Sequence, residues 1–146
     1  MGSVLKVSVV MPVYNEEKYI DNCVQSLLEQ DFQKEDMEWI FVDGGSVDST
    51  VEILNAYSEK YPGLIKVLSN PHKIVPYAMN IGIKESKGEY IIRLDAHADY
   101  AKDYITKCVY FCPVCFKHTG HFFSFVICAN NLIENIVLGK FFNLLL

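Results

Sequence analysis

The stretch KVSVVMPVYNEEKYI, residues 6–20, passes from an apolar run into a polar turn and then into an amphipathic pattern. Its Val-rich beginning is typical of a strand buried on both faces, and Pro12 suits the exit from such a strand. Asn15 belongs to the residue types that cap helices, so we expect a helix to begin after it. From Tyr19 onward, apolar residues recur at helical spacing. The stretch therefore predicts a buried strand, a turn and an amphipathic helix.

The same alternation continues to about residue 108. The expected strands are residues 6–13, 39–42, 64–68 and 89–94, and the expected helices are residues 19–28, 51–61, 76–85 and one that follows Asp103. Gly82 makes the third helix poorer by propensity. Short apolar strands that alternate with amphipathic helices predict an α/β fold, with a doubly wound, mostly parallel sheet covered by helices on both faces.

The composition indicates a folded, acidic chain. Of the 146 residues, 51% are hydrophobic and 21% are charged, which excludes disorder of the chain as a whole. The net charge of −5 disfavours a general nucleic-acid binder, which would usually be basic. Five Cys without a regular framework, and no apolar leader after Met1, suit a reducing compartment. We therefore expect a cytoplasmic location.

Polar residues gather where the predicted strands end, and ligands of parallel sheets bind beyond those ends. Asp95, His97 and Asp99 follow the fourth strand and are candidate metal ligands, the alternative being a solvated acidic turn. Residues 43–48 (DGGSVD) could present backbone N–H groups to a phosphate or a ribose, although an ordinary turn that caps the next helix is the simpler interpretation. Lys73 could be solvated or could reach a phosphate.

Three common signatures do not occur in the sequence: GxGxxG, the P-loop GxxxxGK[ST] and the GxSxG nucleophile elbow. Cys23 falls on the apolar stripe of the first helix, so we expect it in the core and not as a nucleophile. These features disfavour a dinucleotide-binding fold of the usual type, a P-loop NTPase and a serine hydrolase.

Taken together, the front segment resembles the inverting glycosyltransferases of family 2, which have the GT-A fold. The resemblance rests on residues 7–20 (VSVVMPVYNEEKYI), 26–32 (SLLEQDF), 41–50 (FVDGGSVDST) and 78–100 (AMNIGIKESKGEYIIRLDAHADY), which occur in the family's order and spacing. It covers roughly residues 4–108 and is closest to bacterial exopolysaccharide glycosyltransferases. It implies a Rossmann-like half of a GT-A domain with strand order 3-2-1-4.

The resemblance also implies a nucleotide-diphosphate sugar donor, commonly a UDP-sugar, and a divalent metal, Mn²⁺ or Mg²⁺. The residues that it assigns to the nucleotide sugar are Pro12, Val13, Tyr14, Glu16, Asp43, Gly44 and Asp95, and those that it assigns to the metal are Asp95, His97 and Asp99. Two positions depart from the family pattern. Gly44 replaces an acid, which leaves base recognition by that side chain in question. His97 replaces the last acid of the DxD motif, which changes the preferred ion.

Residues 109–146 form a second segment, distinct from residues 1–108. Residues 104–146, which include this segment, contain seven of the nine Phe and four of the five Cys. They do not continue the family pattern, and no residue is assigned as the catalytic base, since Glu134 has no family-like context. A zinc site is a lesser alternative because its ligand pairs would be adjacent; its ligands would be Cys112, Cys115, His118 and His121. We expect a truncated glycosyltransferase whose tail is not native to the fold, as a shifted reading frame near residues 108–110 would produce.

The expected function is inverting transfer of a sugar from a nucleotide-diphosphate sugar to a glycan or lipid-linked acceptor, in polysaccharide or cell-envelope biosynthesis. The alternatives are a non-catalytic nucleotide-sugar-binding module, an inactive truncated fragment and, as a third class, a zinc-stapled interaction protein. We expect no nucleic-acid partner. The apolar tail leaves two possibilities open: a helix on the inner face of the membrane, or a helix that docks on a partner.

Overall fold

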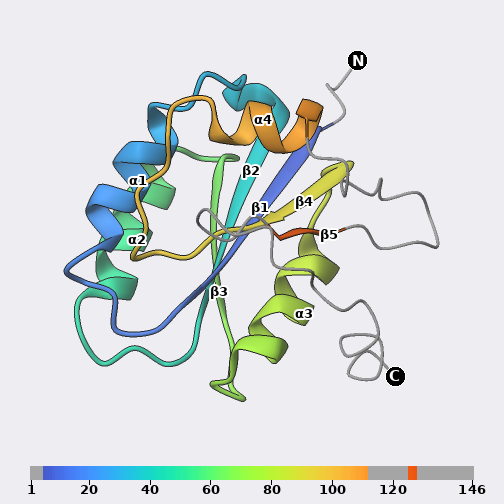
Figure 1. The fold of residues 1–146 in the computed structure, drawn as a ribbon. Coiled ribbons are helices and arrows are strands. Elements are labelled where there is room, and N and C mark those ends of the chain that lie inside the picture. Colours follow the sequence, from blue (N-terminus) through green and yellow to red (C-terminus); the bar gives the residue numbers. More distant parts are fainter. Residues whose placement is uncertain (1–4, 112–124, 128–146) are drawn as a thin grey trace.

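Figure 1 shows the fold in the computed structural model, which describes residues 5–111 and 125–127. The strands are β1 (Val7–Val13), β2 (Met37–Asp43), β3 (Ile65–Ser69), β4 (Tyr90–Arg93) and β5 (Phe125–Ile127). The helices are α1 (Ile20–Leu28), α2 (Thr50–Lys60), α3 (Val75–Glu85) and α4 (Tyr104–Phe111), with a short 3-10 helix, Lys34–Asp36, before β2. In the part of the chain just given, no helix is both long enough and apolar enough to cross a bilayer.

All neighbouring strands are parallel, and their order is β3-β2-β1-β4-β5. The first four strands confirm the predicted α/β class and the strand order 3-2-1-4. The apolar pattern does not predict β5, which lies in the compositionally distinct segment 109–146. The candidate zinc ligands of that segment lie outside the described residues, as does Glu134, which has no assigned role as a base; the zinc candidates are Cys112, Cys115, His118 and His121.

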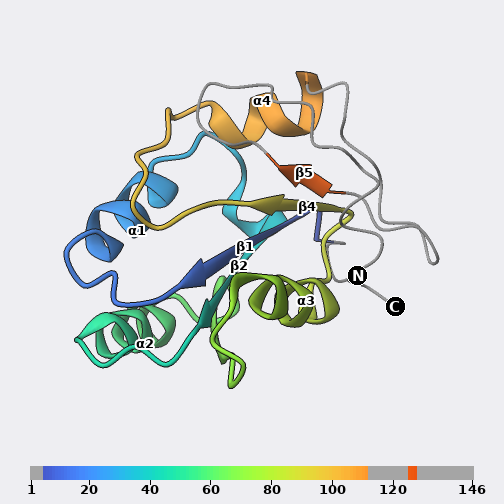
Figure 2. The same ribbon diagram turned by 60° about the horizontal axis from the view of Figure 1, so that its bottom comes forward.

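Alternate residues of the central strands face two separate apolar layers. Val9 and Met11 of β1 belong to the layer that includes α1 and α4, whereas Val10 belongs to the layer under α3. The same alternation separates Phe41 from Val42 in β2. Figure 2 shows α1 and α4 on one side of the sheet and α3 on the other. Because both faces are covered, β1 and β2 are mostly apolar on both faces and do not alternate between apolar and polar residues.

The helix α3 packs closely on β1 because Gly82 has no side chain. A Cβ atom at Gly82 would lie 2.3 Å from Cγ1 of Val10, which no real contact permits. Glycine costs about 1 kcal/mol of helix propensity relative to alanine. The close packing against Val10 offsets that cost, and it holds α3 against the part of the sheet from which the polar strand ends emerge.

Polar groups are buried at the amino end of the sheet, away from those strand ends. Oγ of Ser8 donates to Oε1 of Glu38 at 2.6 Å and accepts the N–H of Gly88 at 2.8 Å. The same oxygen of Glu38 accepts the N–H of Lys87 at 2.5 Å. Because these bonds satisfy Glu38, β2 can begin at Met37, earlier than the apolar run alone predicts.

Candidate functional site

A pocket of about 230 Å³ lies where the strands β1, β2 and β4 end and α3 begins. Several residues that the sequence assigns to the nucleotide sugar or the metal line it: Pro12, Val13, Tyr14, Glu16, Gly44, Asp95 and His97. Asp43 and Asp99 are not among the residues that line it. The pocket is also lined by residues without a predicted role, namely Val42, Asn70, Ile74, Val75, Ala78 and Arg93, and by Lys73.

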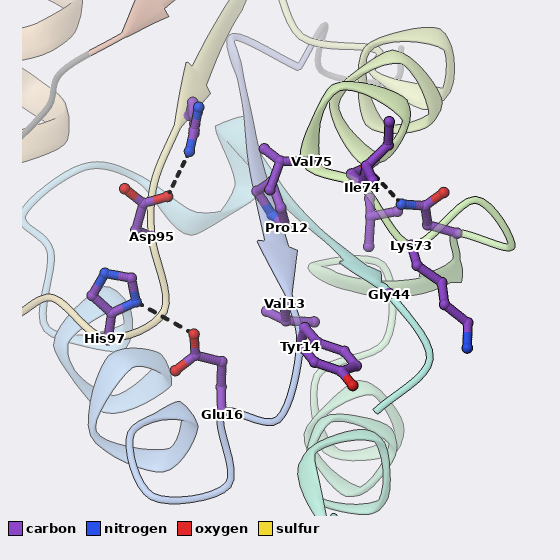
Figure 3. Close-up of a pocket in the computed structure, with 14 residues that line it drawn as sticks. Pro12, Val13, Tyr14, Glu16, Gly44, Lys73, Ile74, Val75, Asp95 and His97 are labelled. Carbon is purple, nitrogen blue, oxygen red and sulfur yellow. Dashed lines mark hydrogen bonds and ion pairs between the residues drawn. The ribbon is translucent and has the colours of Figure 1, made fainter. Parts of the chain in front are cut away.

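The end of β1 divides this pocket into two sides, as Figure 3 shows. Asp95, His97 and Glu16 lie on one side, and Lys73 and the start of α3 lie on the other. The first side carries ionisable side chains that face one another. The second carries backbone, apolar side chains and one ammonium group. The carboxylates of the first side favour a cation, which can in turn hold an anionic part of a ligand, and the second side suits a largely apolar or aromatic part.

Each ionisable side chain on the first side has one close partner. Nη2 of Arg93 lies 3.1 Å from Oδ1 of Asp95, and Nδ1 of His97 lies 3.3 Å from Oε1 of Glu16. The side chains of Asp95 and His97 are 42% and 61% exposed, so solvent screens both pairs and they add little to stability. Both side chains are therefore accessible to a ligand in the pocket.

The loop after β1 is fastened to the loop after β2 through Asn15. Its N–H donates to Oγ of Ser46 at 2.9 Å, and its Oδ1 accepts the N–H of Val47 at 2.9 Å. Asn15 has φ of 53°, a left-handed conformation that Asn tolerates better than most residues. The prediction that Asn15 caps the first helix is wrong: α1 begins at Ile20, with Tyr19 at its N-cap. The side chain that was expected to cap a helix instead joins two loops.

Two further pairs extend this junction. The N–H of Glu16 donates to Oγ1 of Thr50 at 2.8 Å, and the N–H of Glu17 donates to Oδ2 of Asp48 at 3.1 Å. In return, Oε2 of Glu17 accepts the N–H of Ser49 at 3.1 Å. The two loops thus form one unit, which orients the side chain of Glu16 toward His97.

Asp43 builds the turn that follows β2. Asp43 is 8% exposed, and its carboxylate accepts the N–H of Gly45 at 2.9 Å, the N–H of Ser46 at 3.1 Å and the hydroxyl of Ser46 at 2.5 Å. Its backbone oxygen accepts the N–H of Asn70 at 2.7 Å. Residues 43–48 thus form a turn, as the simpler interpretation expects, but the N-cap of α2 is Ser49, without a side-chain capping bond, while Asp48 accepts the N–H of Thr50 at 3.0 Å. Contact between Asp43 and a nucleoside stays a prediction.

The loop between β3 and α3 is shaped by Asn70, which is buried. Its Nδ2 donates to the carbonyl of Ile74 at 2.9 Å, and its Oδ1 accepts the N–H of His72 at 3.1 Å. Lys73, inside this loop, has φ of 63°, which is costly for a residue with a Cβ atom and is often found at functional sites. Asn70-Pro71 is the local signal for a turn. Nothing local assigns the left-handed conformation to Lys73.

The metal ligands expected from the sequence do not form a ready-made cluster. Within residues 5–111 and 125–127, no three His, Cys, Asp or Glu side chains are gathered as a metal site would require. Asp95 pairs with Arg93, and His97 pairs with Glu16. An exposed carboxylate and an exposed imidazole still fit Mn²⁺ when diphosphate oxygens and water supply its other ligands.

Cys23 lies beneath the charged side of the pocket. Burial, together with the nearby carboxylates of Asp99, Glu16 and Asp95, raises the pKa of its thiol to about 12. The thiol therefore stays protonated at neutral pH and is a poor nucleophile. Its placement in the core confirms the expectation from the helical stripe.

Comparison with known proteins identifies relatives of this architecture. Residues 8–112 match the family Glycosyl transferase family 2. The poly(ribitol-phosphate) beta-glucosyltransferase of Bacillus spizizenii is 43% identical over 93 residues, which are 63% of this chain and 15% of that protein. The structure of S. aureus TarS 1–349 in complex with UDP-GlcNAc matches with a TM-score of 0.64 and 32% identity, over 70% of this chain and 29% of that one.

A third match is the mannosyltransferase from Pyrobaculum calidifontis in complex with GDP-Man and Mn²⁺. Its TM-score is 0.68 at 25% identity, over 75% of this chain and 33% of that one. The chain spans less than a third of the length of the first curated relatives that it matches. Because the family match covers most of the chain and includes both sides of the pocket, the chain belongs to glycosyl transferase family 2.

Proposed function

We propose that this chain binds a nucleoside-diphosphate sugar in the pocket and is the donor-binding part of an inverting glycosyltransferase. The observation that carries the proposal is the pocket itself. It joins the ends of β1, β2 and β4 with the start of α3, and its side with Asp95, His97 and Glu16 is separated by β1 from its mostly uncharged side. A nucleoside diphosphate has the same division between an aromatic base and an anionic diphosphate.

In this proposal, the nucleoside lies beside Tyr14, Gly44 and Lys73, on the side that the start of α3 closes. Tyr14 is 55% exposed, so its ring is available to pack against a base. Pro12 and Val13 form the wall that separates the two sides. Asp43 acts through the turn that it holds, which places Gly44 at the pocket wall.

The diphosphate lies on the charged side, where Asp95 and His97 would hold a divalent cation. Such a cation, when bound, neutralises negative charge on the departing nucleoside diphosphate. The chain's own contribution is to orient these ligands. Arg93 pairs with Asp95, and Glu16 accepts the hydrogen bond that a protonated Nδ1 of His97 donates. Mn²⁺ is favoured over Mg²⁺ because His97 supplies an imidazole ligand.

We propose UDP as the nucleotide, because the solved relative with the higher identity binds UDP-GlcNAc, whereas the one at 25% identity binds GDP-Man. The acceptor would be a glycan or a lipid-linked glycan of the cell envelope, because relatives are named as poly(ribitol-phosphate) glycosyltransferases. The proposal keeps the cytoplasmic location that the cysteine usage of the sequence suggests. Contact with the inner face of the membrane is part of this proposal for a lipid-linked acceptor.

A second candidate is a module that binds the nucleotide sugar without transferring it. It is favoured by one observation: the carboxylates that line the pocket, Glu16 and Asp95, both face a partner on the donor side. Neither is placed as a base for an acceptor hydroxyl. UDP release on addition of a glycan acceptor would distinguish the two candidates, because the module binds the donor but releases no UDP.

Calorimetric titration of UDP into the folded chain, with and without Mn²⁺, tests the proposal. We expect binding that Mn²⁺ strengthens and that Asp95→Ala weakens at least tenfold, on the order of a lost metal ligand. Asp103→Ala is the matched control, since Asp103 is similarly exposed, is paired with Lys107 and does not line the pocket. The absence of UDP binding by a chain that is folded by circular dichroism would refute the proposal.

A further inference from the structure

We propose that Tyr100 is a positioning residue for Asp95 and that it acts by holding the backbone of Asp95 from both sides. The proposal rests on the function inferred above, because it concerns the residue that would bind the metal and the diphosphate. Tyr100 itself does not line the pocket.

The phenol oxygen of Tyr100 contacts two backbone atoms of a single residue. It accepts the N–H of Asp95 at 2.8 Å and donates to the carbonyl oxygen of Asp95 at 2.8 Å. The N–H of Ala98 donates to the same carbonyl at 3.3 Å, which closes the turn. The peptide groups on both sides of Asp95 are thereby fixed, so its side chain leaves the backbone in one direction, toward the pocket and Arg93.

The environment of Tyr100 keeps this hydroxyl in place. Tyr100 is 9% exposed, so water competes little for its two hydrogen bonds. The ring packs against Tyr104 of α4, with 5.0 Å between ring centroids. Phenylalanine would preserve this packing and remove only the two hydrogen bonds.

Gln30, at the end of the α1 region, anchors the segment that follows Tyr100. Its Nε2 donates to the carbonyl of Ala101 at 2.7 Å, and its Oε1 accepts the N–H of Ile105 at 3.1 Å. Gln30 is 3% exposed, so these bonds are protected from water. The position of Tyr100 is thus set from α1 as well as from α4, independently of Asp95. The phenol of Tyr100 can therefore set the orientation of Asp95, and its own position does not depend on Asp95.

The decisive variant is Tyr100→Phe, and Tyr57→Phe is its matched control. Tyr57 also makes two hydrogen bonds through its phenol, to Asp21 and Gln25, but it does not line the pocket. The dissociation constant of UDP is measured with and without Mn²⁺, and that of uridine, which has no diphosphate, is measured alone. Hydrogen exchange is followed at the amide of Asp95, with amides of β1 as the internal reference.

We expect Tyr100→Phe to reduce the gain in UDP affinity that Mn²⁺ provides by about tenfold, as loss of an orienting partner commonly does. Affinity for uridine should be unchanged. In the Asp95→Ala background, Tyr100→Phe should have no further effect on UDP binding, because it acts through Asp95. The amide of Asp95 should exchange at least several-fold faster relative to β1. Tyr57→Phe should change none of these quantities.

The outcomes separate the two proposals. If the folded wild-type chain does not bind UDP, the proposed function fails, and the role of Tyr100 fails with it. If the wild type binds and Asp95→Ala abolishes the Mn²⁺ effect while Tyr100→Phe retains it, only the role of Tyr100 is refuted. Equal losses of UDP and uridine affinity would also refute it, since they indicate general loosening. Should Tyr100→Phe not fold, hydrogen exchange of the wild-type chain still tests the proposal, because exchange of the Asp95 amide at the unprotected rate contradicts the bond from its N–H to the phenol.

Discussion

Polar side chains are buried at one end of the parallel sheet and accessible at the other. At the amino end, Ser8, Glu38 and the N–H of Gly88 are buried and bond to one another. At the carboxyl end, the side chains of Asp95 and His97 remain accessible, each with one ionic neighbour. The buried groups have their bonding capacity filled by the protein. The exposed groups retain capacity that a ligand can use.

The difference shows how one sheet supports both stability and binding. At the carboxyl end it is the backbone that is held, through Asn15, Asp43, Asn70 and the phenol of Tyr100. At the amino end it is the side chains that are held. Substitutions at the amino end should therefore change the free energy of unfolding, whereas substitutions of the accessible carboxyl-end side chains should change ligand affinity.

The largest effect is expected from Gly88→Ala at the amino end. A Cβ atom there would lie 2.4 Å from the backbone nitrogen of Ser8, and backbone cannot move aside as a side chain can. We expect a loss of about 3 kcal/mol in the free energy of unfolding, measured by urea denaturation. Gly63→Ala is the control, because Gly63 has φ of +85° but open space around it. Gly63→Ala should lower the free energy of unfolding by about 1 kcal/mol. Equal losses in the two variants would contradict the close approach at Gly88.

The next effect compares two serines, one at each end. Ser8→Ala leaves the N–H of Gly88 and the buried Glu38 carboxylate each short of a partner, and we expect it to cost about 2 kcal/mol. Ser46→Ala also removes two hydrogen bonds, to Asp43 and from Asn15, but water can replace the latter, so we expect about 0.5 kcal/mol. Denaturation of both variants under the same conditions measures the two losses in the free energy of unfolding. A larger loss for Ser46→Ala would reverse the comparison of the two ends.

A smaller effect, on affinity and not on stability, is expected from His97→Ala. If His97 is a metal ligand, the dissociation constant of UDP in the presence of Mn²⁺ should rise about fivefold, equivalent to about 1 kcal/mol. The free energy of unfolding should change by less than about 0.5 kcal/mol because the ring is exposed. His72→Ala is the matched control: His72 stacks on Tyr77 and does not line the pocket. Unchanged UDP affinity in His97→Ala would remove His97 from the proposed site.

The smallest effect is expected at an ion pair that belongs to neither end's polar network. Lys66 lowers the pKa of Glu85 through a hydrogen bond and its charge, and the two atoms are 2.7 Å apart. A lowered folded-state pKa stabilises the fold above the ordinary carboxyl range, near pH 4, and the effect disappears as the pH falls through the folded value. Because both side chains are well exposed, Glu85→Gln should leave Tm at pH 7 within experimental scatter. A clear drop in Tm that persisted at low pH would contradict the small contribution expected of this ion pair.

Much of the fold follows from local pattern. The Val-rich run before Tyr14, the helical spacing after it and the repeated alternation to about residue 108 predict the first four strands and their helices. The resemblance predicts their order. These features depend on neighbours a few residues apart, so the sequence displays them directly. The assignment of polar residues to one edge of the sheet has the same origin, because parallel strands all end on one side.

Other features depend on partners that are remote in the chain. Asn15 before a helical pattern has the appearance of a cap, and only the approach of Ser46 and Val47 makes it a link between loops. Glu38 next to an apolar run does not predict the buried Ser8 hydroxyl that donates to its carboxylate. The strand β5 also depends on β4, whose edge it pairs with.

The sequence by itself determined an α/β chain of family 2 with polar residues at the carboxyl ends of its strands, because apolar periodicity and contiguous motifs are properties of neighbouring residues. Only the tertiary structure decided which of these residues meet. It paired His97 with Glu16, directed the Asp43 carboxylate into its own turn and placed the Tyr100 phenol on the backbone of Asp95. Hydrogen-bond partners are chosen by distance and direction in space, and the folding of β1, β2 and β4 side by side sets both.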